Sequence, residues 1–340
     1  MPDKQSIRVA VVGCGGIAGK HIVGGRERGN VEFVALMDNA TGALDKFEAK
    51  HFADDHAPAP PRFTDAAKMY QKIKPDAVVI NTPHTLHHQQ CVEALDAGCH
   101  VLVEKPMVTD LANAIDLEKR VEASGKVFTV GYNTPCSIEF HKLREITRNQ
   151  ELGRLKVISA YLSQPWVYFT VGSWRQDPAL SGGGQLYDSG AHALNSVVWT
   201  VESDVEQVHA FVDCLDAPVD VNGTMNVRFA NGVIAAIAIN GQSPSSAHAS
   251  FMFEDGRVDI DPWAGGWINI HQCRGGLNSR QIKYPDMPGR DTTPIGNFVD
   301  AILGLDELRT TVRHGIYHSQ LMDAVYESAR TGLPAKPKSV

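Results

Sequence analysis

Two motifs carry side chains that could bind a hydroxylated substrate and accept its proton. Lys105 stands in Val103-Glu104-Lys105-Pro106 after a β-branched run, and Asp188 and His192 follow the glycines 182–184. If a helix begins after those glycines, Asp188 and His192 are one turn apart and share a face. A carboxylate and an imidazole in that arrangement can bind a diol and accept a proton from one of its hydroxyls. The alternatives are ordinary ones, because a helical histidine is more often structural and a strand-terminal lysine is more often a solvated cation.

A second glycine-rich stretch, Val11–Gly19, fits the pattern of a dinucleotide-binding turn. Gly13, Gly15 and Ala18 occupy G-x-G-x-x-G/A, where they permit a tight turn, a close approach of backbone to a diphosphate, and close helix packing. The diphosphate would meet free N–H groups and the positive end of the following helix. An ordinary strand-to-helix turn is the alternative.

Asp38 follows this motif by twenty residues, counted from Ala18, at the end of the next expected strand. A carboxylate there can accept hydrogen bonds from the ribose hydroxyls of a dinucleotide. The next residues, Asn39 and Ala40, offer no cation for a 2′-phosphate, so the sequence favours NAD over NADP.

The elements that must position these residues alternate through the first 130 or so residues. Five short β-branched runs are expected strands: Ile7–Val12, Phe33–Met37, Ala77–Ile80, Val101–Val103 and Val127–Val130. The segments between them are expected helices: Lys20–Gly29, Thr41–Phe52, Thr64–Lys72, Leu86–Ala97 and Leu111–Ser124. Such alternation predicts a doubly wound parallel sheet of the Rossmann type. Ligands bind at the carboxyl ends of its strands, so Lys105 should project toward the ligand crevice, and Pro106 could hold a cis bond beside it.

After Tyr132 the pattern changes to that of an α+β domain with an open, mainly antiparallel sheet. The expected strands are Leu155–Leu162, Val205–Leu215, Thr224–Phe229, Val233–Ile239, Ser250–Phe253, Val258–Ile260 and Trp267–His271. Asn231-Gly232 and Asp255-Gly256 are turn signals between some of them. The expected helices are Ile138–Asn149, Gly184–Thr200, Pro294–Leu303 and Ile316–Thr331. We therefore expect a nucleotide domain at 1–132 and a substrate-binding and oligomerisation domain at 133–340.

Composition excludes several classes of protein. The chain has 340 residues and a net charge of −7, with 32 basic and 39 acidic residues and no basic run, which argues against a nucleic-acid surface. The six cysteines form no C-x-x-C pair or Cys/His cluster, so we expect free thiols and neither a disulfide framework nor a metal site. The apolar runs are too short to span a bilayer or to form a signal segment, so the cytoplasm is the expected location.

In combination, the motifs resemble the glucose–fructose oxidoreductase / inositol dehydrogenase / MocA family. They occur in order along nearly the whole chain: the glycine turn at 13–18, Thr82-Pro83 with His87, Glu104-Lys105-Pro106, Trp174-Arg175, and the glycines 182–184 with Asp188 and His192. The resemblance implies a Rossmann domain followed by an open sheet that packs against a partner subunit, giving a homodimer or homotetramer.

By this resemblance Lys105, Asp188 and His192 match the catalytic lysine, aspartate and histidine of the family. His192 would act as general base, since imidazole has a pKa near neutrality. Lys105 would stabilise the developing alkoxide and anchor cofactor and substrate hydroxyls. Asp188 would orient the substrate and support His192.

The resemblance also extends the set of residues expected at the cofactor and the substrate. The expected cofactor contacts are Gly13, Gly15, Gly16, Ile17, Ala18, Asp38, Asn39, Thr82, Pro83, His84, His87, Glu104 and Lys105. The candidate substrate contacts, beyond the catalytic three, are Tyr132, Asn133, Trp166, Tyr168, Arg175 and Tyr187. Core packing is the alternative for each aromatic residue, and a structural anchor is the alternative for Arg175.

Three positions depart from the family pattern. His84 replaces a common asparagine, so it could contact NAD or simply face solvent. The segment Gly131–Cys136 lacks the arginine that often follows its Gly-aromatic-Asn start, and Asn195 stands where an aspartate is common. These departures bear on the choice of substrate and leave the redox chemistry intact.

The sequence thus predicts an NAD-dependent oxidoreductase that transfers hydride between nicotinamide and a ring hydroxyl of a sugar, glycoside or cyclitol, giving a keto product. Two alternatives stay open. The same residues could serve a redox-neutral glycoside hydrolase that oxidises its substrate only transiently, or the fold could serve a non-catalytic NAD-binding regulator.

Overall fold

The chain divides into two compact units, each of which gathers segments that are distant in sequence. The structure is a computed structural model and describes residues 6–53, 58–273, 278–282 and 292–338. The first unit contains residues 1–107, 116–131 and 293–312, and the second contains 108–115, 132–292 and 313–340. The expected single boundary after residue 132 therefore does not describe segment 293–312, which returns to the first unit.

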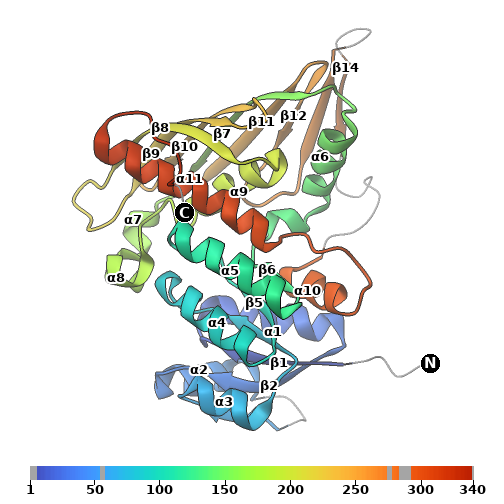
Figure 1. The fold of residues 1–340 in the computed structure, drawn as a ribbon, viewed down its shortest axis with the longest axis vertical. Helices are drawn as coiled ribbons and strands as arrows, with labels where there is room; N and C mark the ends of the chain where they lie inside the picture. Colours follow the sequence, from blue (N-terminus) through green and yellow to red (C-terminus); the bar gives the residue numbers. More distant parts are fainter. Residues whose placement is uncertain (1–5, 54–57, 274–277, 283–291, 339–340) are drawn as a thin grey trace. The chain divides into compact units, whose positions relative to one another are not determined.

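The first unit is built on a six-stranded parallel sheet in the order β3-β2-β1-β4-β5-β6 (Figure 1). Its strands are β1 Ile7–Val12, β2 Val31–Met37, β3 Arg62–Phe63, β4 Ala77–Ile80, β5 His100–Val103 and β6 Phe128–Val130. The expected doubly wound parallel sheet is confirmed. The two-residue strand β3 was not predicted, because so short a strand has no hydrophobic periodicity.

Helices cover this sheet. They are α1 Gly16–Arg28, α2 Thr41–His51, α3 Ala66–Ile73, α4 His87–Asp96 and α10 Pro294–Ile302, with α5 Leu111–Ser124 running across the division between the units. Ile295, Phe298 and Val299 of α10 are buried in one cluster with Ile7 and Val9 of β1. The late helix α10 thus completes the core of the first unit.

The second unit is built on an eight-stranded sheet in the order β14-β13-β12-β11-β7-β10-β9-β8. Its strands are β7 Leu155–Ser163, β8 Val205–Asp213, β9 Asn222–Phe229, β10 Ile234–Asn240, β11 Ser246–Phe253, β12 Gly256–Ile260, β13 Ile268–Gln272 and β14 Asn278–Ile282. All neighbours pair antiparallel except β7 and β10, which confirms the mainly antiparallel sheet. Asn231-Gly232 forms part of the β9–β10 turn, with Gly232 at φ of 87°, whereas in the β11–β12 hairpin Gly256 is already the first residue of β12.

Helices pack on one face of this sheet and leave the other face open. They are α6 Ile138–Asn149, α7 Trp166–Phe169, α8 Pro178–Ser181, α9 Gly190–Val201 and α11 Val312–Thr331. Residues of α6, α9 and α11 share one apolar cluster with inward-facing residues of the strands. Along β9 and β10 buried and exposed residues alternate, as expected for a sheet with one solvated face.

One expected helix is wrong at its start. We expected a helix over 184–200, but α9 begins at Gly190 and the residues before it form an irregular turn. Asp188 therefore precedes the helix that carries His192, and the two residues do not share a helical face. The hydrogen bonds that shape this turn are described below.

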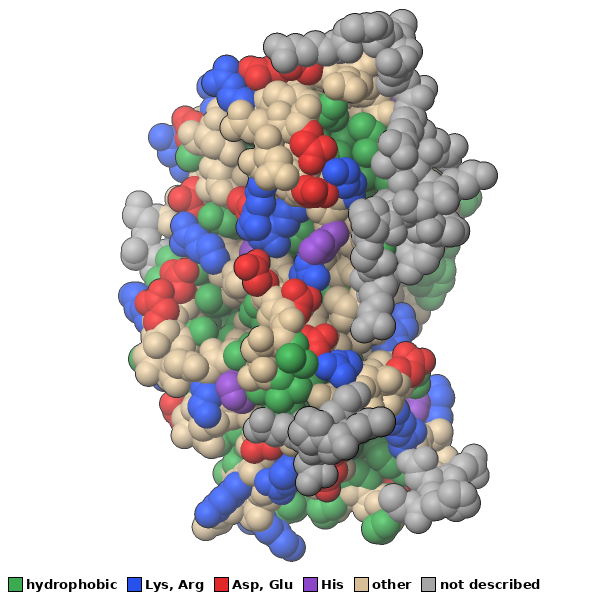
Figure 2. Space-filling model, turned by 90° about the vertical axis from the view of Figure 1, so that its right-hand side faces the viewer, with side chains coloured by type: hydrophobic (Ala, Val, Ile, Leu, Met, Phe, Trp, Pro, Cys, Tyr) green, Lys and Arg blue, Asp and Glu red, His purple; other side chains and the backbone are tan. Residues whose placement is uncertain are grey.

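Charges on the surface are mixed. On the face shown in Figure 2, the described acidic and basic side chains are interspersed, and the basic ones form no continuous stripe there. Within the described residues, no helix has both the length and the apolar character needed to cross a bilayer.

Candidate active site

The glycine turn after β1 has the geometry that its sequence predicts. Gly13 has φ of 84°, in the left-handed region that glycine adopts without strain. A Cβ atom at this position would lie 2.9 Å from both the carbonyl carbon of Asn81 and Cγ2 of Thr82. Any other residue at position 13 would force this turn away from the end of β4.

The start of α1 presents open backbone. Gly15 is the N-cap and no side chain caps the helix there. A Cβ atom built on Gly15 or Gly16 would meet nothing within 4 Å. Because the first N–H groups of a helix have no intrahelical partner, this end suits the diphosphate of a dinucleotide. Ala18 is fully buried, which fits its expected role in close helix packing.

Asp38 lies next to this turn at the end of β2. Its Oδ2 accepts a hydrogen bond from the Cys14 N–H at 2.9 Å, and its Oδ1 accepts one from the Ala40 N–H at 2.9 Å. The carboxylate is thus fixed by backbone beside the glycine turn, while lone pairs on both oxygens remain for further donors. Burial, and then the charge of Asp38, raises the pKa of the Cys14 thiol to about 12. Asn39 is exposed.

The end of β5 is tied to α1 by a buried pair that sequence reasoning missed. His21 Nε2 lies 2.8 Å from Glu104 Oε1, and both side chains are almost fully buried. Burial alone would raise the pKa of Glu104, but the hydrogen bond from His21 and the positive charges nearby lower it. A Cβ on Gly131 would lie 2.9 Å from Glu104 Oε1, so this glycine makes room for the pair. Lys105 follows directly, is partly buried, and precedes Pro106 through a cis peptide bond.

His87 and His84 are both buried. His87 Nδ1 lies 2.8 Å from the Pro106 carbonyl oxygen and its Nε2 lies 2.9 Å from that of Thr82. Burial lowers the pKa of His87, and a neutral ring can donate to only one of these carbonyls. His87 therefore braces Thr82 against the Lys105-Pro106 segment. His84 is only 3% exposed, so it does not face solvent.

In the second unit, two predicted substrate contacts converge on Asp188. Trp166 Nε1 donates to Asp188 Oδ2 at 2.8 Å, and Arg175 Nε donates to the same oxygen at 2.9 Å. Trp166 is buried, the Arg175 side chain is 38% exposed, and the Asp188 side chain is 8% exposed. The guanidinium thus compensates a carboxylate that is nearly removed from water, as a buried charge requires.

Four other candidate contacts differ in exposure. Tyr132 and Tyr187 are buried, as their core-packing alternative predicted, whereas Asn133 and Tyr168 are exposed. The ring of Tyr132 packs edge-on against that of His192 at a centroid distance of 6.3 Å. His192 itself is partly buried near the start of α9. The structure thus places Tyr132 against His192 and Trp166 and Arg175 against Asp188.

Two further residues were missed because nothing local marks them. Asp220, between β8 and β9, binds the turn that carries Asp188, and Tyr326, on α11, donates its hydroxyl to Asp220 and lies against Gly183. They lie more than thirty residues from the motif they contact, so no spacing pattern could have indicated them. Lys105 belongs to the first unit, whereas Asp188 and His192 belong to the second.

Comparison with known proteins identifies the family. The model described as "oxidoreductase family, NAD-binding Rossmann fold" of Gfo/Idh/MocA matches residues 7–132, and the Gfo/Idh/MocA C-terminal domain model matches residues 140–259. D-glucoside 3-dehydrogenase of Escherichia coli is 26% identical over 96% of this chain and 96% of its own. The scyllo-inositol 2-dehydrogenase (NADP(+)) of Bacillus subtilis is 26% identical over 75% of this chain and 76% of its own.

A solved structure has the same fold. The WlbA dehydrogenase from Bordetella pertussis, in complex with NADH and UDP-GlcNAcA, superposes with a TM-score of 0.79 at 23% identity, over 99% of this chain and all of that one. Together the two family models match residues 7–132 and 140–259 of this chain. The chain belongs to the Gfo/Idh/MocA family of oxidoreductases, with an NAD-binding Rossmann domain at its start.

Proposed function

We propose that this protein is an NAD-dependent dehydrogenase that oxidises a ring hydroxyl of a sugar, glycoside or cyclitol to a ketone. Family membership supports the oxidoreductase class, and two relatives are named for a glucoside and an inositol. The observation that carries the proposal is the anchored carboxylate of Asp188. Trp166 and Arg175 fix it just ahead of the helix that bears His192, which suits a pair that binds a hydroxyl and removes its proton.

In the proposed reaction, three side chains of this chain have separate roles. Bound NAD supplies the hydride acceptor. His192 takes the hydroxyl proton, a role that suits an imidazole near neutral pH. Lys105 stabilises the negative charge that develops on the substrate oxygen. Asp188 binds a neighbouring hydroxyl and holds the ring in the orientation for transfer.

We assign the cofactor preference to Asp38. Backbone N–H groups of Cys14 and Ala40 hold its carboxylate in place, so it can accept bonds from ribose hydroxyls and would repel a 2′-phosphate. One relative is named for NADP, so the preference varies among similar proteins. NAD should therefore support turnover far better than NADP.

The test is NADH formation over a panel of monosaccharides, glycosides and inositols. We expect at least one compound to reduce NAD, and we expect H192A and K105A to abolish that turnover while NAD still binds by fluorescence titration. H141A and K119A, which alter exposed residues on α6 and α5, serve as matched controls and should retain wild-type rates. Unchanged turnover in H192A and K105A would refute the proposed roles, and glycoside cleavage without NADH would favour the redox-neutral alternative.

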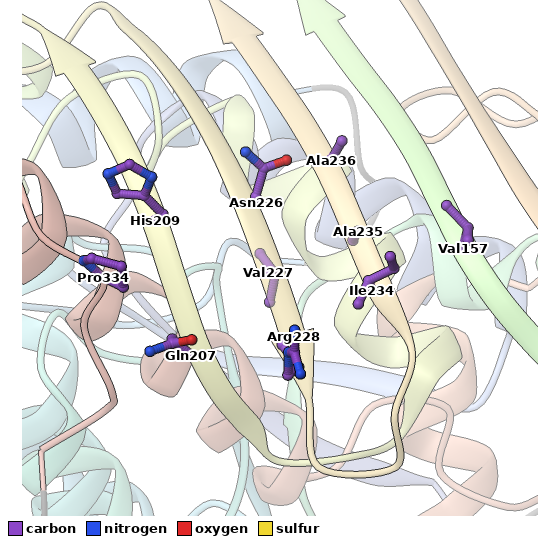
Figure 3. A pocket seen from close by; sticks show the side chains of 10 residues that line it. All are labelled: Val157, Gln207, His209, Asn226, Val227, Arg228, Ile234, Ala235, Ala236 and Pro334. Carbon is purple, nitrogen blue, oxygen red and sulfur yellow. The ribbon is translucent and has the colours of Figure 1, made fainter.

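We also propose that the open face of the eight-stranded sheet forms a contact between identical subunits. A groove of about 310 Å³ crosses this face over β7, β8, β9 and β10 (Figure 3). Phe211 on β8 and Ile234 on β10 are 68% and 46% exposed, so a contact over this face would cover two large apolar side chains.

Light scattering after gel filtration tests this contact. The wild-type protein should be a dimer or tetramer, and the double variant F211D/I234D should dissociate, because it buries charge in the contact. L305D, at a similarly exposed leucine of the first unit, is the control and should keep the wild-type mass. A monomeric wild-type protein would exclude the proposal.

A further inference from the structure

Asp220 is a buried carboxylate that makes all its described polar contacts to one turn and one tyrosine. Its Oδ1 accepts a hydrogen bond from the Gly184 N–H at 2.6 Å, and its Oδ2 accepts one from the Leu186 N–H at 2.8 Å. Its carbonyl oxygen accepts the Gln185 N–H at 2.9 Å. A single residue thus binds three successive N–H groups of the turn that leads to Asp188.

The glycines of this turn fit Asp220 and Tyr326 closely. A Cβ atom on Gly184 would collide with the Asp220 backbone, and one on Gly183 would collide with the Tyr326 hydroxyl. The same hydroxyl donates to Asp220 Oδ1 at 2.5 Å. Burial, and then the charge of Asp220, raises the pKa of Tyr326, so it stays a donor. The space beside these glycines is therefore filled by protein.

The backbone hydrogen bonds after the glycines depart from α-helical spacing before α9 begins. The Asp188 N–H bonds the Gly184 carbonyl, but the Gly190 N–H reaches back to the Gln185 carbonyl at 2.8 Å, which spans one residue more than an α-helical turn. The turn at residues 185–190 is therefore wider than a turn of α-helix. Asp220, which lies outside the turn, binds the N–H groups of the residues at its start. The width of the turn changes the direction in which Asp188 leaves the backbone relative to His192.

We infer that Asp220, assisted by Tyr326, is a positioning residue that sets the direction of the Asp188 carboxylate through the turn 184–190. The inference rests on the proposed function, in which Asp188 binds substrate. Asp220 then holds the backbone of residues 184–186 just before Asp188, and Trp166 and Arg175 hold the carboxylate oxygen of Asp188. Tyr187, within the turn, adds a packing contact, because its ring lies 5.6 Å from that of Tyr326.

The variant D220N tests the inference with a side chain of nearly the same size and shape as aspartate. An asparagine keeps one acceptor but points an NH₂ group at the N–H of Gly184 or Leu186, so one bond of the turn becomes a contact between two donors. Y326F removes only the hydroxyl and keeps the ring packing. D213N is the matched control, since Asp213 lies in the same β8–β9 region and its carboxylate binds Leu215 and Asn222 instead of the turn.

The first measurement is hydrogen exchange of the peptide that spans residues 183–190, which needs no substrate. We expect faster exchange in D220N, a smaller increase in Y326F, and the wild-type rate in D213N. Wild-type exchange in both D220N and Y326F would overturn the inference. If D220N does not fold, Y326F decides this measurement alone.

The second measurement separates positioning from general destabilisation. We expect kcat to fall roughly 10- to 100-fold in D220N, because a small misplacement of a reacting group has effects of that size, while the KM for NAD is unchanged. In the double variant D188N/D220N, kcat should lie within about twofold of D188N alone, since Asp220 acts through Asp188. A full additional loss in the double variant would overturn the inference.

The exchange and kinetic measurements distinguish a failure of the inference from a failure of the proposed function. If no panel compound reduces NAD in the wild-type protein, the proposed function fails, and the exchange measurement still decides whether Asp220 holds the turn. If the wild-type protein is active and D220N has full kcat, the inference fails and the proposed function stands.

Discussion

At the scale of single residues, Arg175 provides the positive charge that pairs with the Asp188 carboxylate. A guanidinium that donates to a nearly buried carboxylate compensates the charge of that carboxylate. Arg175 is itself only partly exposed, so it is poorly placed to exchange Asp188 for a substrate group. We therefore expect Arg175 to act as an anchor for Asp188, which is one of the two roles that the sequence left open.

The variant R175Q tests this anchor. We expect kcat/KM to fall roughly 10- to 100-fold, because Asp188 would lose its charge partner and its fixed direction. R175K should recover only part of the loss, since an ammonium group cannot reproduce the geometry of Nε. Steady-state kinetics measure the effect, with R154Q at an exposed ion pair as the control. Wild-type kcat/KM in R175Q would show that Trp166 alone holds the carboxylate.

A second prediction concerns the buried pair of His21 and Glu104. H21A leaves the Glu104 carboxylate buried without its partner, and breaking such a pair costs about 3–5 kcal/mol of unfolding free energy. The control is H88A, because His88 and Asp116 form a pair with the same 2.8 Å distance at a more exposed place. That variant should lose less than about 1 kcal/mol. Urea unfolding at pH 7 measures both, and equal losses would contradict the prediction.

The residues that could be found from the sequence are those with local neighbours. Gly13, Ala18 and Asp38 follow from spacing within one strand–turn–helix unit, and the structure places Asp38 beside the turn as expected. Asp220, Tyr326 and the anchoring role of Trp166 could not be found this way. Their contacts join residues that lie 22 or more positions apart in the sequence.

At the scale of elements, the strands were easier to predict than the turn that matters most. β1, β4, α5 and α6 were predicted with their observed bounds, because each has a clear hydrophobic period or a β-branched run. The short helices α7 and α8 have four residues each and carry no period. The turn before α9 was predicted as helix, because the wide bond from the Gly190 N–H to the Gln185 carbonyl has no local signature in the sequence.

The end of α9 gives a prediction with a defined pH dependence. Glu202 caps this helix with φ of 48° and contacts Arg144, Arg148 and His314. Burial would raise the pKa of Glu202, but the bonds from His314 and Arg148 and the charge of Arg144 lower it strongly. A lowered folded pKa means that the carboxylate stabilises the fold above the pKa of the unfolded group, about 4.3, and that this stability is lost as pH falls.

E202Q should therefore be destabilised at pH 7 by about 1–3 kcal/mol, and the difference from wild type should shrink as the pH falls below about 4. Unfolding by urea at pH 7, 5 and 3.5 measures the trend. E327Q, at an exposed pair with Arg330, is the control and should change by less than about 0.5 kcal/mol throughout. A difference between E202Q and wild type that is constant with pH would contradict the assigned cause.

At the scale of the whole molecule, the position of a segment in the sequence does not determine which hydrophobic core it joins. Strand and helix alternation predicted where the parallel sheet begins and ends, but it gave no sign that residues 293–312 return to it. The reason is physical, because an amphipathic helix shows that it must be covered without showing which core covers it. α10 carries Phe298 into the cluster of β1 and β4, more than two hundred residues earlier in the chain.

A crossed pair of variants tests this assignment. F298A and F251A each remove a fully buried ring, and each should cost about 3–5 kcal/mol of stability. Because compact units open separately, hydrogen exchange should accelerate in β1 and β4 for F298A, and in β9 and β10 for F251A, whose ring lies in the other cluster. If F298A instead loosens β9 and β10 and leaves β1 protected, α10 stabilises the second unit, and the single boundary expected from the sequence is the better description.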